Sequence, residues 1–306
     1  MKYICHPILI FTTSFVSFSN SINIPVIFVH LQAEKSFYLK YSLTQAKKFN
    51  PRVILISDAH NNLFPEIECH NLFNYCSGAK KFISIYKHLS PNEYPYEIFC
   101  FQRWFILKEF MHSERIEKCF YCDSDVMLYC NTTEEYNKYY SRYEASLMEF
   151  LSDGFNAIKG KVYTGGVAFW SKTELENFCK HLEKSFKNKS KISRWENLFK
   201  SNQYNEGLSD MTLLTDYKYT RSNKYDLLIG NLHEIRDDSV FDHYLASDDQ
   251  GNYVMKKDKP KRLIKDIVFK NGFPYCYNKK LKKYIRLKAL HFQADLKMLM
   301  SEYMTE

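Results

Sequence analysis

Glycine and proline are scarce in this sequence, with nine glycines and eight prolines among 306 residues. This scarcity excludes a collagen-like chain, and there is no Gly-, Ser- or Pro-rich linker, internal repeat or low-complexity segment. A hydrophobic content of 45% excludes a disordered chain. The mean hydropathy of −0.43 excludes a polytopic membrane protein. The composition is therefore that of a globular protein of one or two domains.

Long apolar runs are lacking as well. The apolar stretch at residues 7–18 has only about twelve residues, which is too short to cross a bilayer. Its length is typical of the apolar part of a signal peptide, but no small-residue cleavage site follows it. We therefore expect an additional strand or a peripheral segment at this place.

Charge of one sign is only moderately in excess: 43 Lys and Arg stand against 35 Asp and Glu, a net charge of +8. Two stretches, residues 256–265 and 279–288, are rich in lysine. The excess suits a polyanionic substrate, a membrane surface or nucleic acid and selects none of them. Zinc-finger spacing, an aromatic RNA-binding motif and a basic region with heptads are all missing, so we expect solvated hairpin faces and no nucleic-acid partner.

Nine cysteines are spread thinly through the chain, as expected of buried apolar side chains in a reducing compartment. Cys119 and Cys122 have CxxC spacing, but they lie in an expected strand. Residues three apart in a strand face opposite sides, so these two thiols are not expected to share a zinc ion. We expect a cytoplasmic protein and leave peripheral membrane contact open.

Buried strands and amphipathic helices alternate along the first half of the chain. Residues 24–29 and 53–56 are short apolar runs typical of strands buried on both faces, and a helical pattern at 36–49 lies between them. A strand–helix–strand unit of this length predicts a right-handed crossover and a parallel sheet. Further expected elements are helices at 96–111, 173–186 and 209–217, strands at 116–125 and 162–170, and a hairpin within 267–292 around Asn271-Gly272. The predicted fold is a Rossmann-like α/β/α sandwich with a mixed, mainly parallel sheet and a C-terminal β-hairpin region.

Two aspartates lie at the C-terminal end of the strand expected at 116–125. Asp123 and Asp125 are separated by one residue, so an extended backbone directs both carboxylates to one side. Ligands of open α/β sheets bind beyond the carboxyl ends of the strands. Carboxylate oxygens suit a hard divalent cation, whose coordination a diphosphate can complete. A merely acidic strand-to-turn junction is the alternative, but apolar residues on both sides favour coordination.

Other candidate residues are scattered along the chain, and each has a structural alternative. His291 could add an imidazole ligand, and Lys297 could reach a phosphate or simply lie on a solvated helix face. Arg103 lies among aromatic residues of a helix, where its guanidinium would need an anionic partner. The expected strand at 162–170 contains Gly165 and Gly166, which allow either a close approach to a ligand or a β-bulge. Ser209 or Asp210 is expected to cap the helix at 209–217. Asp210 is otherwise a candidate catalytic carboxylate, and Asp242 is a weaker second candidate for that role.

In combination, these residues resemble the GT-A-fold glycosyltransferases, most closely the family-eight group that includes glycogenin-like and lipopolysaccharide-galactosyltransferase-like enzymes. The likeness extends from about Ile24 to Lys297. It comprises the first strand and helix, an Arg-bearing helix, Asp123-x-Asp125, a glycine-containing strand, an acid at the start of a helix, and a C-terminal motif similar to H-x-x-G-x-x-K. This sequence has Ala294 at the usual glycine and Ser-Asp-Met-Thr around Asp210, which leaves the retaining or inverting outcome open.

The resemblance implies a metal-dependent transfer of a sugar from a nucleoside-diphosphate donor, expected to be a UDP-sugar, to a hydroxyl of a glycan, glycolipid or protein. It implies Mn²⁺ or Mg²⁺ held by Asp123, Asp125 and His291, with Asp123 also near the ribose. The other implied donor-binding residues are His30, Asp58, Arg103, Gly165, Gly166 and Lys297, and Asp210 is the candidate general base.

The resemblance also implies one GT-A domain over residues 1–306. It consists of an N-terminal extension at 1–23, a nucleotide-sugar-binding half at 24–131, and an acceptor half at 132–306 that includes the C-terminal metal and diphosphate motif. Two other classes remain open: a metal-dependent phosphohydrolase or nucleotidyltransferase that uses Asp123 and Asp125, and a non-catalytic binding protein.

Overall fold

The computed structural model describes most of the chain: residues 23–58, 63–152, 160–201, 207–222, 228–241, 244–260 and 262–305. The apolar stretch at 7–18 and Asp242 lie outside the described residues. No helix in the described part of the chain combines the length and the apolar character that crossing a membrane requires.

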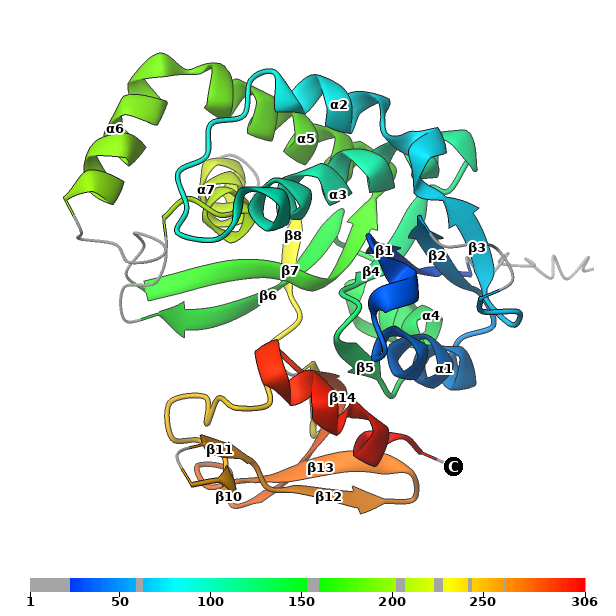
Figure 1. Cartoon of the computed structure of the whole chain (residues 1–306). Helices are drawn as coiled ribbons and strands as arrows, with labels where there is room; N and C mark the ends of the chain where they lie inside the picture. The colour runs from blue at the N-terminus through cyan, green and yellow to red at the C-terminus, as the bar shows by residue number, and fades with distance from the viewer. Residues whose placement is uncertain are drawn as a thin grey trace, which may run out of the picture.

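A seven-stranded sheet forms the centre of the molecule, in the order β3-β2-β1-β4-β7-β6-β8 (Figure 1). Strands β1, β2, β3 and β4 are parallel, β7 runs against both β4 and β6, and β8 is parallel to β6. The predicted mixed, mainly parallel sheet is therefore confirmed. The bounds of the strands are β1 Val26–His30, β2 Val53–Ser57, β3 Glu68–Asn71, β4 Lys118–Cys122, β6 Ala145–Ser152, β7 Gly160–Ser171 and β8 Ile229–Asn231.

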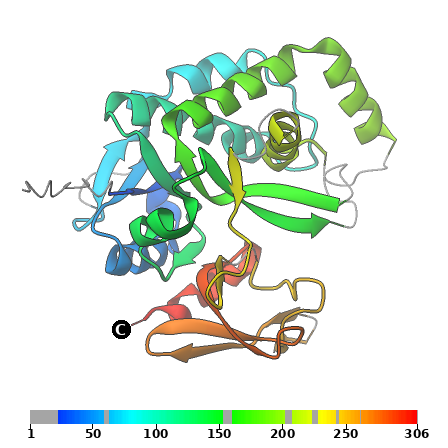
Figure 2. The ribbon, with the colours of Figure 1, turned by 180° about the vertical axis from the view of Figure 1, so that it is seen from behind.

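Helices cover both faces of this sheet, as the views from the front and from behind show (Figures 1 and 2). One apolar core joins the sheet to α2, α3, α5 and α7, and a second core on the other face joins it to α1 and η3. Within β1, Ile27 belongs to the first core and Phe28 to the second, which explains why this strand is apolar throughout. Cys119 and Cys122 likewise lie in different cores, as the strand geometry predicted.

The four predicted helices correspond to α1, α3, α5 and α7, with ends that agree within three residues except that α7 extends five residues further; α2, α4 and α6 were not predicted. The α-helices are α1 Leu39–Phe49, α2 Ser77–Ile83, α3 Tyr94–Ser113, α4 Thr132–Glu135, α5 Lys172–Lys187, α6 Lys189–Lys200 and α7 Asp210–Ser222. The 3₁₀ helices are η1 Ala33–Lys35, η2 Leu72–Tyr75 and η5 Ala294–Tyr303, and η3 Tyr136–Tyr140 is a π-helical turn.

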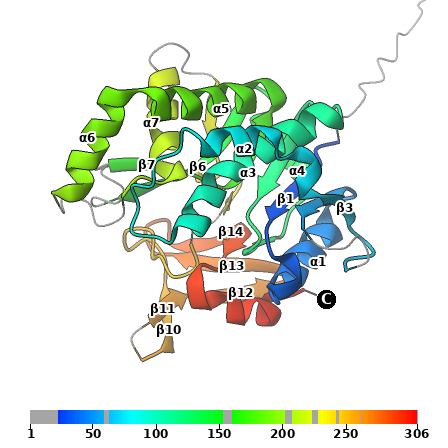
Figure 3. The same cartoon turned by 45° about the horizontal axis from the view of Figure 1, so that its top comes forward.

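A second sheet from the C-terminal part of the chain lies beside the first (Figure 3). Its order is β12-β13-β14-β5, β9 pairs with β14, and β10 and β11 form a separate hairpin. At the β12–β13 turn, Asn271 and Gly272 have φ values of 50° and 75°, as a two-residue turn of this kind requires, so the predicted hairpin is confirmed. The bounds are β5 Val126–Leu128, β9 Ser239–Phe241, β10 Met255–Lys259, β11 Arg262–Lys265, β12 Ile267–Lys270, β13 Phe273–Asn278 and β14 Lys283–His291.

The strand predicted at 116–125 corresponds to β4, which ends at Cys122. The predicted continuation of this strand to Asp125 is wrong. The chain leaves the first sheet after Cys122, turns over the next three residues, and enters the second sheet as β5. The backbone N–H of Val126 donates to the Asp123 carbonyl (3.0 Å), which closes the turn. The two aspartates therefore lie at the junction of the two sheets.

Candidate functional site

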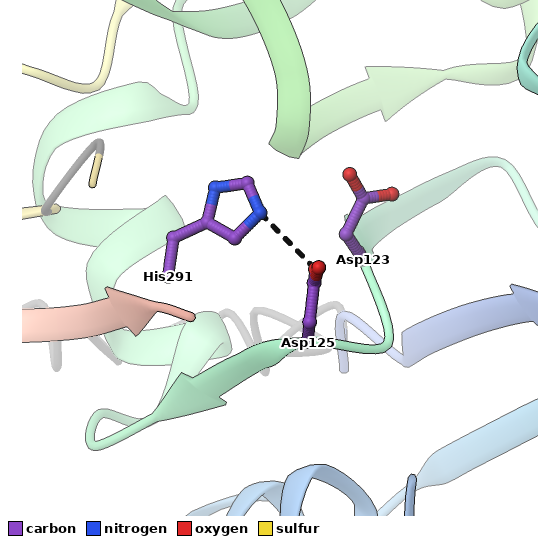
Figure 4. Close-up of side chains that lie close together, drawn as sticks. All are labelled: Asp123, Asp125 and His291. Carbon is purple, nitrogen blue, oxygen red and sulfur yellow. Dashed lines mark ion pairs between the residues drawn. The ribbon is translucent and has the colours of Figure 1, made fainter. Parts of the chain in front are cut away.

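The junction between the sheets brings the acidic pair to the histidine of the C-terminal motif. His291 is the last residue of β14 and pairs with Val126 of β5, one residue beyond Asp125. The backbone N–H of Phe292 donates to the Asp125 carbonyl at 2.8 Å. One ligand atom each of Asp123, Asp125 and His291 lies within 4.8 Å of the others. Figure 4 shows the imidazole and the two carboxylates around a common space.

Opposite charges surround Asp125. Its Oδ1 lies 3.1 Å from His291 Nε2, and its Oδ2 lies 3.1 Å from Lys297 Nζ. Burial raises the pKa of Asp125, but His291 and Lys297 outweigh burial and hold this pKa below its usual value. The carboxylate is therefore charged at neutral pH and can serve as a cation ligand.

Asp123 has a different environment, although its carboxylate is close to that of Asp125. Burial, together with the neighbouring Asp125 charge, raises the pKa of Asp123 despite the nearby Arg103 guanidinium. Two adjacent carboxylates repel each other, and a shared divalent cation removes this repulsion. The set of two carboxylates and one imidazole fits Mn²⁺ or Mg²⁺ in its chemistry.

Arg103 connects Asp123 to Asp210, which comes from a distant part of the chain. Its Nη1 lies 2.5 Å from Asp123 Oδ1, and its Nη2 donates to Asp210 Oδ2 at 2.8 Å. Trp104 Nε1 donates to the same Asp210 oxygen at 3.0 Å, and the Tyr121 hydroxyl donates to Asp123 Oδ1 at 2.7 Å. Arg103 Nε is buried and has no hydrogen-bond partner among the described residues. Arg103 is thus held rigidly, with one donor unused.

A pocket of about 440 Å³ opens over the acidic pair. One wall is the segment from the end of β1 to Tyr38, and the opposite wall is the start of α3. The polar and charged side chains on its lining include His30, Ser36, Tyr38, Tyr96, Arg103, Asp123, Asp125 and Lys297. Of the predicted residues, His30, Arg103, Asp123, Asp125 and Lys297 therefore share one pocket.

His30 and Asp58 both contact the loop at residues 31–36, His30 through a side chain of the loop and Asp58 through the loop's backbone. His30 Nε2 lies 2.7 Å from the Ser36 hydroxyl, and burial lowers the pKa of His30 to about 4, so the ring is neutral at pH 7. Asp58 accepts hydrogen bonds from the backbone N–H groups of Gln32 (2.9 Å) and Ala33 (3.1 Å). Asp58 therefore fixes the loop that forms the pocket wall.

The two glycines of β7 have different neighbours. A Cβ on Gly165 would lie 2.5 Å from the Trp104 ring, whereas a Cβ on Gly166 would lie 3.4 Å from both Asp123 Oδ2 and His291 Cε1. Gly166 thus borders the acidic cluster, and Gly165 packs in the core. The β6–β7 register also shifts here, so the predicted bulge is present; a close approach of this backbone to a ligand stays a prediction.

Asp210 is the first residue of α7, and its side chain is only 5% exposed. Ser209 caps this helix, since its hydroxyl accepts from the Thr212 N–H at 3.3 Å. The expected cap function thus falls to Ser209, while the Asp210 carboxylate is bound by Arg103 and Trp104.

Sequence reasoning missed Tyr121 and Trp104 as parts of this site. Tyr121 lies two positions before Asp123 along an extended chain, a spacing that directs both to one side. Trp104 is adjacent to Arg103, but the direction of its indole N–H depends on where α7 packs. The spacing of Tyr121 and Asp123 can be recognised in the sequence, whereas the direction of the Trp104 N–H cannot.

No protein-family model and no curated protein matches this chain. Solved structures with a similar course of the chain include three glycosyltransferases. Mouse xyloside xylosyltransferase 1 has a TM-score of 0.46 and 8% identity over 71% of this chain and 87% of that one. An active-site mutant of LgtC has a TM-score of 0.46 and 11% identity (92% and 95% covered), and a glycosyltransferase for the major capsid of PBCV-1 has 0.42 and 10% (92% and 98%). Because all three TM-scores are below 0.5, the chemistry of this chain has to be inferred from its own site.

Proposed function

We propose that this protein is a glycosyltransferase that uses a nucleoside-diphosphate sugar, with a UDP-sugar as the first candidate donor. The observation that carries the proposal is the meeting of Asp123, Asp125 and His291 within 4.8 Å, beside a pocket that Arg103 and Lys297 also line. A cation site next to two basic side chains suits a diphosphate, which carries several negative charges. We propose a hydroxyl of a glycan, glycolipid or protein as the acceptor.

Asp123, Asp125 and His291 would hold Mn²⁺ or Mg²⁺. When bound, such a cation stabilises negative charge that develops on a departing diphosphate. The chain itself supplies the ligands in a fixed arrangement: the Ser42 hydroxyl of α1 donates to the Ser124 carbonyl, within the turn that carries the two aspartates. Gly166 leaves room beside the cluster, because any side chain there would approach Asp123 and His291.

Arg103 and Lys297 would bind the diphosphate from two sides. Arg103 lines the pocket, and Asp123 and Asp210 fix the orientation of its guanidinium. Burial lowers the pKa of Lys297, but the Asp125 charge outweighs burial and raises it, so Lys297 is cationic. Both charges are in place before reaction, which is the arrangement that stabilises developing charge most effectively.

The wall that contains His30 would receive the nucleoside. A neutral imidazole beside the Ser36 hydroxyl can exchange hydrogen bonds with a base or ribose without adding charge. Asp58 would contribute indirectly, because it holds the Gln32–Ala33 backbone. The donor would then lie with its diphosphate over the acidic pair.

Asp210 is the candidate general base if the reaction inverts the sugar configuration. Its buried carboxylate already accepts from Arg103 and Trp104, an arrangement that equally supports a positioning role. If the reaction retains the configuration, the departing phosphate can take the proton of the acceptor's hydroxyl group. Asp210 would then orient Arg103 and the sugar.

A donor screen tests this proposal. The protein is incubated with a panel of nucleotide sugars in Mn²⁺, Mg²⁺ or EDTA, with and without a broad set of glycan, glycolipid and peptide acceptors. We expect cation-dependent release of the nucleoside diphosphate that rises with an acceptor, together with sugar on the acceptor. Transfer of the nucleotide, or release of inorganic phosphate, would instead indicate a nucleotidyltransferase or phosphohydrolase. Cation-dependent binding of UDP without turnover of any donor would indicate a binding protein.

A further inference from the structure

The positive charge of the chain is concentrated in its C-terminal sheet. Between residues 255 and 288, thirteen Lys and Arg stand against two Asp. The whole chain has 43 basic and 35 acidic residues, so the remainder is slightly acidic. One local segment therefore accounts for the net positive charge, and the catalytic pocket proposed above does not explain it.

The β10–β11 hairpin and the β13–β14 turn start from the same end of the C-terminal sheet. The β13–β14 turn begins at Lys279, whose backbone N–H donates to the Asn252 carbonyl at 2.7 Å, just before β10. Val254 N–H donates to the Tyr277 carbonyl at 3.1 Å, so β10 leaves directly from the end of β13. Figure 1 shows the β10–β11 hairpin beside this end of β13.

Several cations of this region have carboxylate partners, and others do not. Arg262 pairs with Asp258 and Asp295, Lys259 pairs with Asp295, and Lys256 pairs with Asp266. Within the described residues, no ion pair engages Lys257, Lys279, Lys280 or Lys282, and all four side chains are exposed. Their charge is thus available to a partner.

Exposed leucines lie among these lysines. Leu281 is in the middle of the Lys-Lys-Leu-Lys-Lys turn and is 43% exposed, and Leu263 is 50% exposed on β11. Leu263 stands directly opposite Lys257 in the hairpin. We call Lys257, Leu263, Lys279, Lys280, Leu281 and Lys282 together the basic tip.

We propose that the basic tip binds the surface of an anionic lipid bilayer, with its leucines inserted among the headgroups. Lysines near such a surface attract it, and aliphatic side chains gain by leaving water. The exposed aliphatic side chains of Leu263 and Leu281 between the lysines favour a bilayer over a nucleic acid, whose binding gains most from aromatic stacking and bidentate arginines. The proposal is independent of the sugar-transfer proposal, since the basic tip shares no residue with the pocket.

Vesicle flotation tests this proposal with the full chain. We compare vesicles of phosphatidylcholine alone with vesicles that also contain phosphatidylserine, at low and at high salt. The test variant is Lys279→Gln/Lys280→Gln/Lys282→Gln, and the control Lys184→Gln/Lys189→Gln/Lys200→Gln removes the same charge from exposed sites on α5 and α6. Since each lysine near an anionic surface contributes about a fivefold factor, we expect the test variant to lose about 100-fold in partitioning. The control should lose far less.

The leucine contribution is tested separately. Leu281→Asn should lower partitioning about tenfold, whereas Leu63→Asn, at a site that is also 43% exposed, should not change it. Equal binding of the wild type to neutral and anionic vesicles, or equal binding of the test and control lysine variants, would overturn the proposal. So would lysine-dependent binding of a labelled single-stranded RNA without vesicle binding. Thermal melts of each variant establish that the change is not a loss of folding.

Discussion

Arg103 Nη2 lies 2.8 Å from Asp210 Oδ2, and the two side chains are 13% and 5% exposed. The same guanidinium contacts Asp123, so one side chain joins the acidic pair to the start of α7. A planar group with a fork of donors can bridge two carboxylates in this way, and an ammonium group cannot.

Arg103→Lys should therefore weaken donor binding even though the charge is kept. We expect at least a tenfold rise in the dissociation constant of UDP in the presence of Mn²⁺, equivalent to about 1.4 kcal/mol, measured by calorimetry. Arg221→Lys is the matched control, because Arg221 makes a comparable fork with Glu174 between α5 and α7, away from the pocket. The control should lose stability and keep UDP affinity. Unchanged UDP binding by Arg103→Lys would remove Arg103 from the donor site.

Asp125→Ala should abolish cation-dependent donor turnover, and His291→Ala should weaken Mn²⁺ binding at least tenfold, because each removes one ligand of a three-residue set. Mn²⁺ titration followed by calorimetry or electron paramagnetic resonance measures the second effect without any substrate. Asp295→Ala is the control, as Asp295 is an exposed acid of η5 that pairs with Lys259 and Arg262. A His291→Ala titration that matches the wild type would show that the imidazole is structural.

The sequence allowed a prediction of the main strands and helices of the first sheet, but not of α2, α6, β3 or β6, nor of the long-range contacts between elements. The alternation of apolar runs and helices indicated the main sheet, because strands buried on both faces have a distinctive pattern. The acidic pair was recognisable because both residues follow a strand within three positions. The turn that separates the acidic pair from β4 could not be recognised. The apolar residues 126–128 look like a continuation of the same strand, although they form β5 in the second sheet.

Contacts between residues that are far apart in the sequence could not be predicted from local patterns. The approach of His291 to Asp125 depends on the register of β14 against β5, which no local signal encodes. The contact of Arg103 with Asp210 depends on how α7 packs against α3. Asp58 was predicted to bind the donor, and its observed partners are two backbone amides; a direct role toward the donor stays a prediction.

Gly165 and Gly166 should respond differently to the same substitution. In Gly165→Ala the new methyl group would lie 2.5 Å from the fully buried Trp104 ring, so we expect a loss of about 2 kcal/mol in the free energy of unfolding. In Gly166→Ala the methyl group would make ordinary contacts at 3.4 Å and should cost little stability. Urea denaturation measures both. Equal losses would contradict the different surroundings assigned to the two glycines.

Ala294 has a φ of 52°, in the left-handed region that favours glycine. It occupies the position of the glycine in the H-x-x-G-x-x-K motif that this part of the sequence resembles. A Cβ in this conformation costs about 1 kcal/mol. Ala294→Gly should therefore raise the free energy of unfolding by up to about 1 kcal/mol, less the flexibility that glycine adds to the unfolded chain. Thermal melts of this variant, with Ala246→Gly as a control, measure the difference. A lower melting temperature for Ala294→Gly would show that the strain is relieved elsewhere.

His30 should make the stability of the cation-free protein depend on pH. Burial lowers its pKa from 6.5 to about 4, so below pH 6.5 the unfolded chain takes up a proton that the folded protein does not. Stability from this group is complete above pH 6.5 and is lost as the pH falls toward 4. The loss reaches about 2.5 kcal/mol by pH 4.5. In His30→Asn this part of the pH dependence should disappear, while His112→Asn, a half-exposed position at the end of α3, should keep it. Urea denaturation in EDTA between pH 7 and pH 4.5 measures the slope, and parallel curves for His30→Asn and the wild type would show that another group titrates.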